Sequence, residues 1–108
     1  MITYNDFEKI DIRIGTILEA SPLPNARNPA YLMHIDFGEL GILKTSAQIT
    51  ARYKAKALLG KQVLAVVNFP KKQIGKIQSA CLVLGSLNKD GVILLKTPVK
   101  VKNGTKVQ

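Results

Sequence analysis

Apolar residues alternate with polar ones in short stretches of this chain, and prolines or glycines separate the stretches. Ile10, Ile12 and Ile14 alternate with charged residues, and the same two-residue period returns over 31–37. A period of two places successive side chains on opposite faces of a strand, whereas a helix repeats every 3.6 residues. The run over 21–29 holds three prolines and can only be a loop. The pattern therefore predicts a fold made mainly of short β-strands.

The first half of the chain predicts three strands. The first begins at Ile10 and continues to Leu18, and Gly15 interrupts its alternation as a β-bulge would. The second covers 31–37, and a hairpin leads into the third over 41–47. Before them, Thr3 is placed to cap a short amphipathic N-terminal helix.

The second half of the chain begins with a predicted helix and returns to strands. The segment 50–60 is rich in Ala, Lys and Leu, with Thr50 as the expected N-cap and Gly60 as the expected stop. A fourth strand over 61–69 and a fifth over 77–86 follow. After them, an Asp-Gly turn is predicted to lead into a sixth strand over 92–97. The tail over 98–108 also has strand-like alternation.

This order predicts an all-β fold with short helices, the OB-fold. That fold is a five-stranded Greek-key barrel with three strands, a helix and two more strands. Its ligand face lies between the loop joining strands 1 and 2 and the loop joining strands 4 and 5. These loops correspond to 21–29 and 70–76. A chain of 108 residues with 46% hydrophobic and 21% charged residues predicts one globular domain over 1–108.

Positive charge is concentrated in the second half of the chain. The net charge is +9, but residues 1–50 carry four basic and six acidic residues, and residues 51–108 carry twelve basic residues and one acid, Asp90. Such asymmetry indicates either a polyanion or acidic surface as partner, or a basic protein whose lysines face water.

The residue inventory argues against catalysis and against a bound metal or cofactor. There is one histidine, His34, between apolar residues of a strand, and one cysteine, Cys81, in an apolar run. No pair of carboxylates at a defined spacing and no phosphate-binding glycine motif occurs. We expect a binding protein, no metal site and no cofactor. No segment approaches the ~18 apolar residues of a membrane span, so we expect a cytoplasmic protein without membrane insertion.

Three lysines crowd the second rim loop. Lys71, Lys72 and Lys76 surround Gly75, which allows the backbone to approach a ligand. They either neutralise phosphates or protect a hairpin tip from edge pairing. With only three Phe, three Tyr and no Trp, the chain has few rings to stack single-stranded bases, so structured RNA is the better fit.

Three polar residues lie near the base of the same loop. Asn68 ends the fourth strand, Ser79 lies early in the fifth, and Gln48 follows the third. They either offer hydrogen bonds to a ligand or act as local caps and turn residues.

Three stretches together resemble a known family: DIRIGTI, TSAQIT and VVNFPKKQIGKIQSACLVLG. They are similar to the tRNA-binding domain of some methionyl-tRNA synthetases and of the phenylalanyl-tRNA synthetase beta subunit. The resemblance implies an OB-fold with terminal extensions that form a homodimer, and it implies affinity for tRNA. The RNA-contacting positions of the family correspond to a set of six residues here: Asn68, Lys71, Lys72, Lys76, Ser79 and, more weakly, Arg13.

The run Gln-Ser-Ala-Cys-Leu over 78–82 departs from the synthetase-type domains, and the apolar ending LVLG resembles the freestanding CsaA branch of this family, whose members are export-related chaperones. That branch implies binding of unfolded or presecretory polypeptides and an encounter with the export motor protein. Phe69, Ile74 and Ile49, with Gln48 beside them, are the candidate peptide contacts. The alternative for each apolar residue is an ordinary place in the core, and for Ile49 this alternative is favoured. A CsaA-like chaperone is therefore the first hypothesis, and a tRNA-binding protein that recognises shape and phosphate is the alternative.

Dimerisation has a second motivation in the sequence. Phe7 on the N-terminal helix and a strand expected at Val99–Val101 have little of the domain left to cover them.

Overall fold

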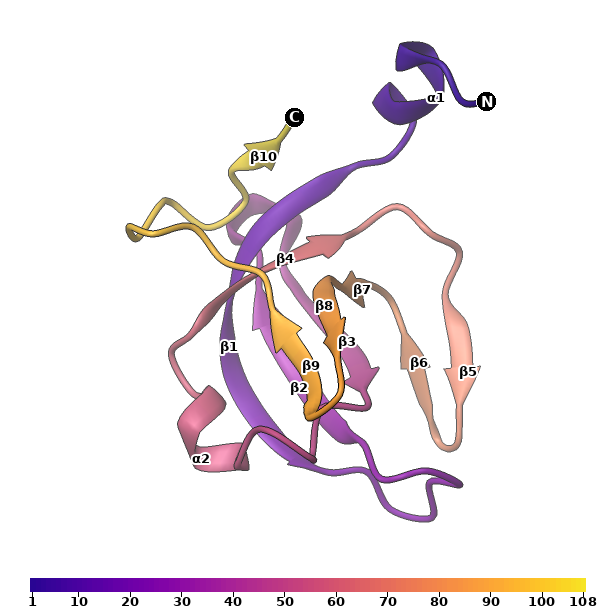
Figure 1. Ribbon diagram of the computed structural model, residues 1–108, viewed down its shortest axis with the longest axis vertical. Helices are drawn as coiled ribbons and strands as arrows, with labels where there is room; N and C mark the ends of the chain where they lie inside the picture. Colours follow the sequence, from indigo (N-terminus) through magenta and orange to yellow (C-terminus); the bar gives the residue numbers. More distant parts are fainter.

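The computed structural model describes residues 1–108 (Figure 1). Its main sheet is built around the long strand β1 (Ile12–Pro22). The first half of this strand pairs with β4 (Gln62–Val66) and its second half with β2 (Tyr31–Asp36), both antiparallel. Strand β2 also pairs with β3 (Ile42–Ala47), and β4 pairs with β7 (Leu82–Val83). The sheet order is β3-β2-β1-β4-β7.

The two edges of this sheet approach each other, so the barrel is nearly closed. The Ala80 N–H donates to the Lys44 carbonyl of β3 at 2.8 Å. The Thr45 hydroxyl of the same strand donates to the Cys81 carbonyl at 2.7 Å. Closure of this kind removes most exposed sheet edges. The predicted fold class is confirmed: a mostly β, five-stranded antiparallel barrel with short helices, the OB-fold.

The barrel interior is filled by the alternation seen in the sequence. Met33, Ile35 and Phe37 are fully buried, and the residues between them face outward. Gly15 lies against this layer, because an added Cβ would stand 2.7 Å from both Ile35 Cγ2 and the Phe37 ring. The β-bulge predicted at Gly15 is wrong in position, since the register shifts between Ile17 and Glu19.

The N-terminal helix α1 (Tyr4–Glu8) is confirmed with its cap. The Asp6 N–H donates to the Thr3 hydroxyl and the Thr3 N–H donates to the Asp6 carboxylate, which is a capping box. The helix buries none of its residues and projects away from the barrel (Figure 1). The first strand begins at Ile12 rather than Ile10, because Ile10 still donates its N–H to the helix.

The second helix is much shorter than predicted. Helix α2 covers only Ala55–Leu58, with Lys54 rather than Thr50 as N-cap. The Tyr53 carbonyl would accept a helical hydrogen bond if the helix began at Thr50, but it accepts the Tyr31 hydroxyl at 2.7 Å instead. The predicted stop is confirmed, since Gly60 follows the helix with a φ of +82°.

The predicted strand over 61–69 ends early, and the one over 77–86 is interrupted. Strand β4 ends at Val66, and 77–86 divides among β6 (Ile77–Ser79), β7 and β8 (Gly85–Asn88). Strand β6 pairs with β5 (Lys72–Ile74) in a separate two-stranded sheet, whereas β7 pairs with β4. One continuous strand cannot serve both partners, so the chain breaks at Ala80–Cys81, where it crosses the gap in the barrel.

The C-terminal part completes the structure with short elements. Strand β9 (Gly91–Leu94) pairs with β8 around the predicted turn, and β10 (Lys106–Val107) pairs with the start of β1. The strand expected at Val99–Val101 does not form, because the Gln62 side chain takes both backbone groups of Val101.

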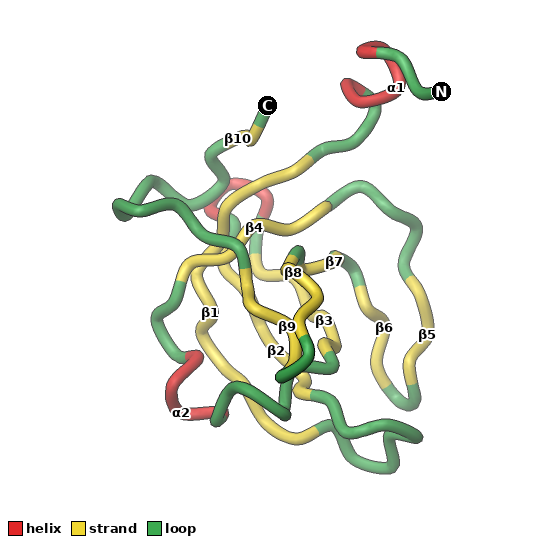
Figure 2. Tube along the Cα trace, in the orientation of Figure 1, coloured by secondary structure: helices red, strands yellow, loops and turns green.

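The connections agree with the predictions apart from small shifts. Figure 2 shows the long loop between β1 and β2, which starts at Leu23 because β1 continues to Pro22. The short 3-10 helix η1 (Gly38–Leu40) joins β2 to β3. None of the helices has the length and apolar character needed to cross a bilayer.

Candidate nucleic-acid and polypeptide interface

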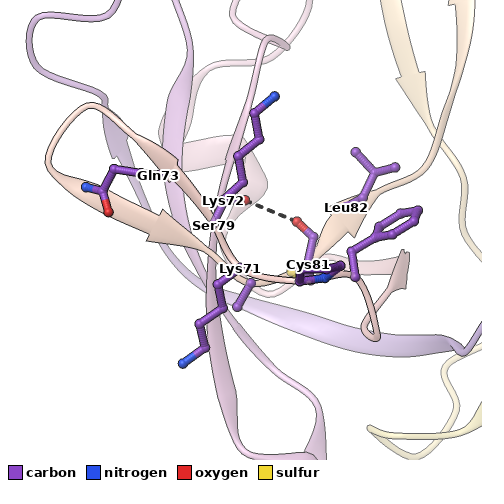
Figure 3. A pocket seen from close by; sticks show the side chains of 9 residues that line it. Lys71, Lys72, Gln73, Ser79, Cys81 and Leu82 are labelled. Carbon is purple, nitrogen blue, oxygen red and sulfur yellow. Dashed lines mark hydrogen bonds between the residues drawn. The ribbon is translucent and has the colours of Figure 1, made fainter.

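The β5–β6 hairpin carries three exposed lysines on a short, regular frame. Lys72 pairs with Ser79 and Ile74 with Ile77, so Gly75 and Lys76 form the tip. Gly75 has a φ of +58°, a conformation that glycine adopts without steric cost. Lys71 and Lys72 extend in opposite directions (Figure 3). Neither they nor Lys76 form an ion pair, so all three charges remain free for a ligand.

An apolar hollow of about 580 Å³ opens beside the root of the hairpin (Figure 3). Phe69 and Leu82 supply its exposed apolar surface, with 53% and 50% of their area accessible. Lys71 and Lys72 also line the hollow. The arrangement suits a ligand that combines an apolar group with negative charge. Leu82 was not among the candidates, although its position next to buried Cys81 in an alternating strand could have indicated it.

Ser79 and Cys81 lie at the back of this hollow. The Ser79 and Thr45 hydroxyls are 3.2 Å apart, and both lie within hydrogen-bond distance of the Cys81 carbonyl. Burial raises the pKa of the Cys81 thiol to about 11, and the hydrogen bond with Thr45 only partly opposes this shift. The thiol is therefore protonated at neutral pH and acts as a small apolar group.

The two loops predicted to form the rim do meet. A hollow of about 360 Å³ lies between the β1–β2 loop and the hairpin tip, and Arg27, Gln48, Ile74 and Gly75 are among its lining residues. A further hollow of about 390 Å³ on another side of the hairpin includes Lys71 and Lys76. The hairpin lysines therefore border two separate hollows, and Ile74 and Gln48 share a third.

Asn68 and Arg13 are engaged within the chain. Asn68 accepts the Asp11 N–H at 2.9 Å and donates to the Lys9 carbonyl at 2.7 Å, which ties the linker after α1 to the end of β4. The Arg13 guanidinium donates to Asp11 at 2.6 Å and to the Gly104 carbonyl at 3.0 Å. Arg13 lines a different hollow, beside the C-terminal turn, and is not brought together with the hairpin lysines.

Ile49 and His34 do not belong to the rim. Ile49 is only 3% exposed and is part of the core, so it does not reach a surface where a peptide would bind. The His34 Nδ1 atom lies 3.1 Å from a Glu19 carboxylate oxygen across the β1–β2 pair. Nowhere in the structure do three or more His, Cys, Asp or Glu side chains gather as metal ligands would.

The fold and the site define a small β-barrel binding domain in which a basic hairpin adjoins an apolar hollow. Residues 12–106 match the family described as "Putative tRNA binding domain". The chain belongs to this family of tRNA-binding domains, as the sequence motifs predicted. Membership supports tRNA binding as the general function.

The curated relatives that match are much longer proteins. Methionine–tRNA ligase of Parabacteroides distasonis is 36% identical over 108 residues, and that of Pyrococcus horikoshii is 32% identical over 107 residues. In both cases the match covers 99% of this chain but only 16% and 14% of the ligase. The matching region is the binding domain of the family.

Two crystal structures match the chain over its whole length. The CsaA chaperone protein from Picrophilus torridus is 51% identical, with a TM-score of 0.94 and all of both chains covered. The chaperone CsaA from Bacillus anthracis is 45% identical, also with a TM-score of 0.94, and the match covers 100% of this chain and 99% of that one. The CsaA-like fold inferred from the sequence is confirmed.

Proposed function

We propose that the chain binds structured RNA, tRNA in the first place, through the lysines of the β5–β6 hairpin. The observation that carries this function is the set of three exposed, unpaired lysines on one hairpin of a tRNA-binding family domain. Each ammonium group that neutralises a phosphate releases counterions, which favours binding at low salt. Such contacts position a nucleic acid without reading its bases, so the recognition is one of shape and phosphate.

The remaining RNA candidates take different parts in this proposal. Ser79 lies opposite Lys72 in the hairpin, and its hydroxyl donates to the Cys81 carbonyl, so it acts by holding the root of the hairpin beside the lysines. Asn68 acts indirectly, because both ends of its amide hold the chain where the hairpin begins. Arg13 is held by Asp11 and Gly104 and contributes to RNA binding only if the RNA reaches the hollow beside the C-terminal turn.

The salt dependence of tRNA binding tests this proposal. A variant with Lys71, Lys72 and Lys76 changed to Gln should reduce the slope of log K against log salt by about three, roughly one for each lost phosphate contact. Binding would be followed by fluorescence anisotropy between about 50 and 200 mM salt. A control variant with Lys56, Lys96 and Lys100 changed to Gln loses the same charge outside the hairpin. Equal slopes for the two variants would assign the hairpin lysines to solubility alone.

The second candidate function is that of a CsaA-like chaperone that holds unfolded or presecretory polypeptides. The apolar hollow beside Phe69 and Leu82 supports it, because an extended chain can place an apolar side chain there while Lys71 and Lys72 meet acidic residues. The two CsaA chaperones with nearly the same fold add weight. The lysine border also suits an acidic partner such as the export motor protein. Ile74 and Gln48 extend this surface toward the β1–β2 loop.

A labelled unfolded peptide distinguishes this function from RNA binding. Phe69→Ala should weaken peptide binding about thirtyfold if the bound peptide buries the ring and the ring contributes ~2 kcal/mol to binding. Leu87→Ala is the matched control, because Leu87 is 89% exposed on β8 and lies outside the hollow. If both variants bind the peptide equally well, the hollow is not a polypeptide site. Competition between peptide and tRNA would show that the two cargoes share the rim.

A homodimer is the assembly that the uncovered helix α1 favours. Tyr4 is largely exposed and Phe7 only partly buried, and nothing in the chain packs over the helix to bury it. A second copy would cover both rings. Light scattering after gel filtration should give twice the chain mass of 11.8 kDa, and Phe7→Asp should halve that value. A wild-type mass equal to one chain would overturn the proposal. Both cargoes occur in the cytoplasm, where we propose the protein acts.

A further inference from the structure

A second basic hollow lies beside α2 and takes no part in the site described above. Its volume is about 650 Å³. Seven residues line it: Ala51, Arg52, Tyr53, Lys54, Ala57, Lys61 and Asp90. Three of them are cations and one is an acid, so the hollow has a positive balance. The residues come from the turn before α2, from the helix and its C-terminal side, and from the β8–β9 turn.

The cations of this hollow form no ion pairs within the chain. None of Arg52, Lys54 and Lys61 forms an ion pair with a carboxylate, Asp90 included. All three side chains belong to exposed residues. Cations grouped in this way repel one another, and a bound anion relieves that repulsion.

Tyr53 gives the hollow a rigid wall. Its N–H donates to the Ile49 carbonyl, its carbonyl accepts the Tyr31 hydroxyl, and its own hydroxyl accepts the Leu94 N–H at 3.0 Å. The Lys61 Nζ atom lies over the fixed ring, 5.5 Å from its centroid. A cation held over an aromatic face is partly ordered before a ligand arrives, which reduces the entropy lost on binding.

The hollow beside α2 and the hollow at the hairpin tip are lined by residues that are close together in the sequence. Gln48 lines the hollow at the hairpin tip together with Ile74 and Arg27, whereas Arg52 lines the second hollow. Arg52 follows Gln48 by four positions, so their Cα atoms are at most about 14 Å apart. Arg27 adds a cation to the hollow at the hairpin tip. One RNA backbone can therefore meet the hairpin lysines and the second hollow in sequence.

We propose that Arg52, Lys54 and Lys61 form a second phosphate-binding surface for the RNA that the hairpin holds. The inference rests on the proposed RNA binding. The Arg52 guanidinium can donate two parallel hydrogen bonds to one phosphate, and the two ammonium groups act as point charges beside it. Asp90, at the edge of the hollow, repels the same phosphates and weakens the contact.

The first test removes the three cations. A variant with Arg52, Lys54 and Lys61 changed to Gln should lower the salt slope of tRNA binding by about three relative to wild type. The control with Lys56, Lys96 and Lys100 changed to Gln carries the same net charge, and Lys56 belongs to α2 itself. The inference is overturned if the variant at Arg52, Lys54 and Lys61 has the same salt slope as the control. The proposed RNA binding still stands in that case if the variant at Lys71, Lys72 and Lys76 has a reduced slope. If wild type binds no tRNA, the proposed function fails first.

The second test acts in the opposite direction and does not depend on the stability of a triple variant. Asp90→Asn should tighten tRNA binding by about three- to tenfold at low salt, because it removes a repulsive charge from the hollow. Glu8→Gln removes one negative charge on α1 and is the matched control. An equal gain in both variants, or no gain in Asp90→Asn, would overturn the inference. A change in peptide binding without a change in tRNA binding would also contradict it.

Discussion

The barrel core and the β5–β6 hairpin are both built from antiparallel pairs, but they bury very different shares of their side chains. In β2 every second residue is buried, and Phe37 after it is fully enclosed. In the hairpin no residue is buried, and each strand pairs only with the other. The buried side chains of the barrel therefore provide most of the stability, and the exposed hairpin provides charges for a ligand. Substitutions in the core should lower stability, and substitutions in the hairpin should weaken ligand binding.

Two phenylalanines, one in the core and one beside the hairpin, should differ most in their effect on the free energy of unfolding. Phe37→Ala should lower the free energy of unfolding by about 3–5 kcal/mol, because a fully buried ring leaves a cavity. Phe69→Ala should change it by only about 1 kcal/mol or less, since half of that ring is already exposed. Urea denaturation of both variants measures the difference. Similar losses would mean that the rim, too, stabilises the barrel.

The buried Cys81 thiol should make the stability of the barrel depend on pH in the alkaline range. Burial raises its pKa from 9.0 to about 11, so the unfolded chain loses this proton first as the pH rises. The contribution to stability is fully present below pH 9 and disappears as the pH passes 11, a loss of about 2–3 kcal/mol. The difference in unfolding free energy between wild type and Cys81→Ala should therefore change over this range. A constant difference would show that the thiol is not buried as described.

Asn68 lies where the two regions join, and its loss should affect stability more than RNA binding. Asn68→Ala removes the hydrogen bonds to Asp11 and Lys9, at a cost of about 1–2 kcal/mol. Thermal unfolding measures the loss, and anisotropy with tRNA measures the affinity of the folded variant. A large fall in affinity with an unchanged melting temperature would instead make the amide a direct RNA contact.

The hairpin tip should show the smallest effect on the whole fold. Gly75→Ala places a Cβ at a φ of +58° and should strain the tip by about 1–2 kcal/mol, whereas Gly75→Asn should be tolerated better. Because the hairpin does not share the core, we expect local loosening: faster amide exchange at Lys72 to Ser79 and a few-fold weaker tRNA binding in the alanine variant. A fall of the global melting temperature in both variants would contradict the separation.

Alternation and turn residues in the sequence were sufficient to predict the barrel. The period of two over 31–37, the loop over 21–29 and the Gly60 stop all correspond to observed features. They are local effects, because strand periodicity and glycine conformation depend on adjacent residues. The rim was also predictable in outline, because the strand order determines which loops lie at one end of the barrel.

The errors share a cause that lies outside local sequence. The helix expected from Thr50 begins at Ala55 because Tyr31, distant in the chain, takes the Tyr53 carbonyl. The strand over 77–86 breaks because its parts pair with different neighbours. Ile49 is a candidate peptide contact by position, with the core as the favoured alternative, and the barrel buries it. The periodicity of a sequence reflects only nearby residues, so it does not predict which distant residues will be in contact.

The strand-rich fold, the family and the concentration of lysines at one loop all follow from the sequence, because each depends on adjacent residues or on their order. Which of those residues are free to act depends on long-range contacts in the folded chain, and the structure shows these contacts. It engages Asn68 and Arg13 in internal hydrogen bonds and leaves Lys71, Lys72 and Lys76 unpaired. The same folding exposes Phe69 beside the hairpin. The partners of these polar groups lie far apart in the sequence, so they come within hydrogen-bond distance only in the folded chain.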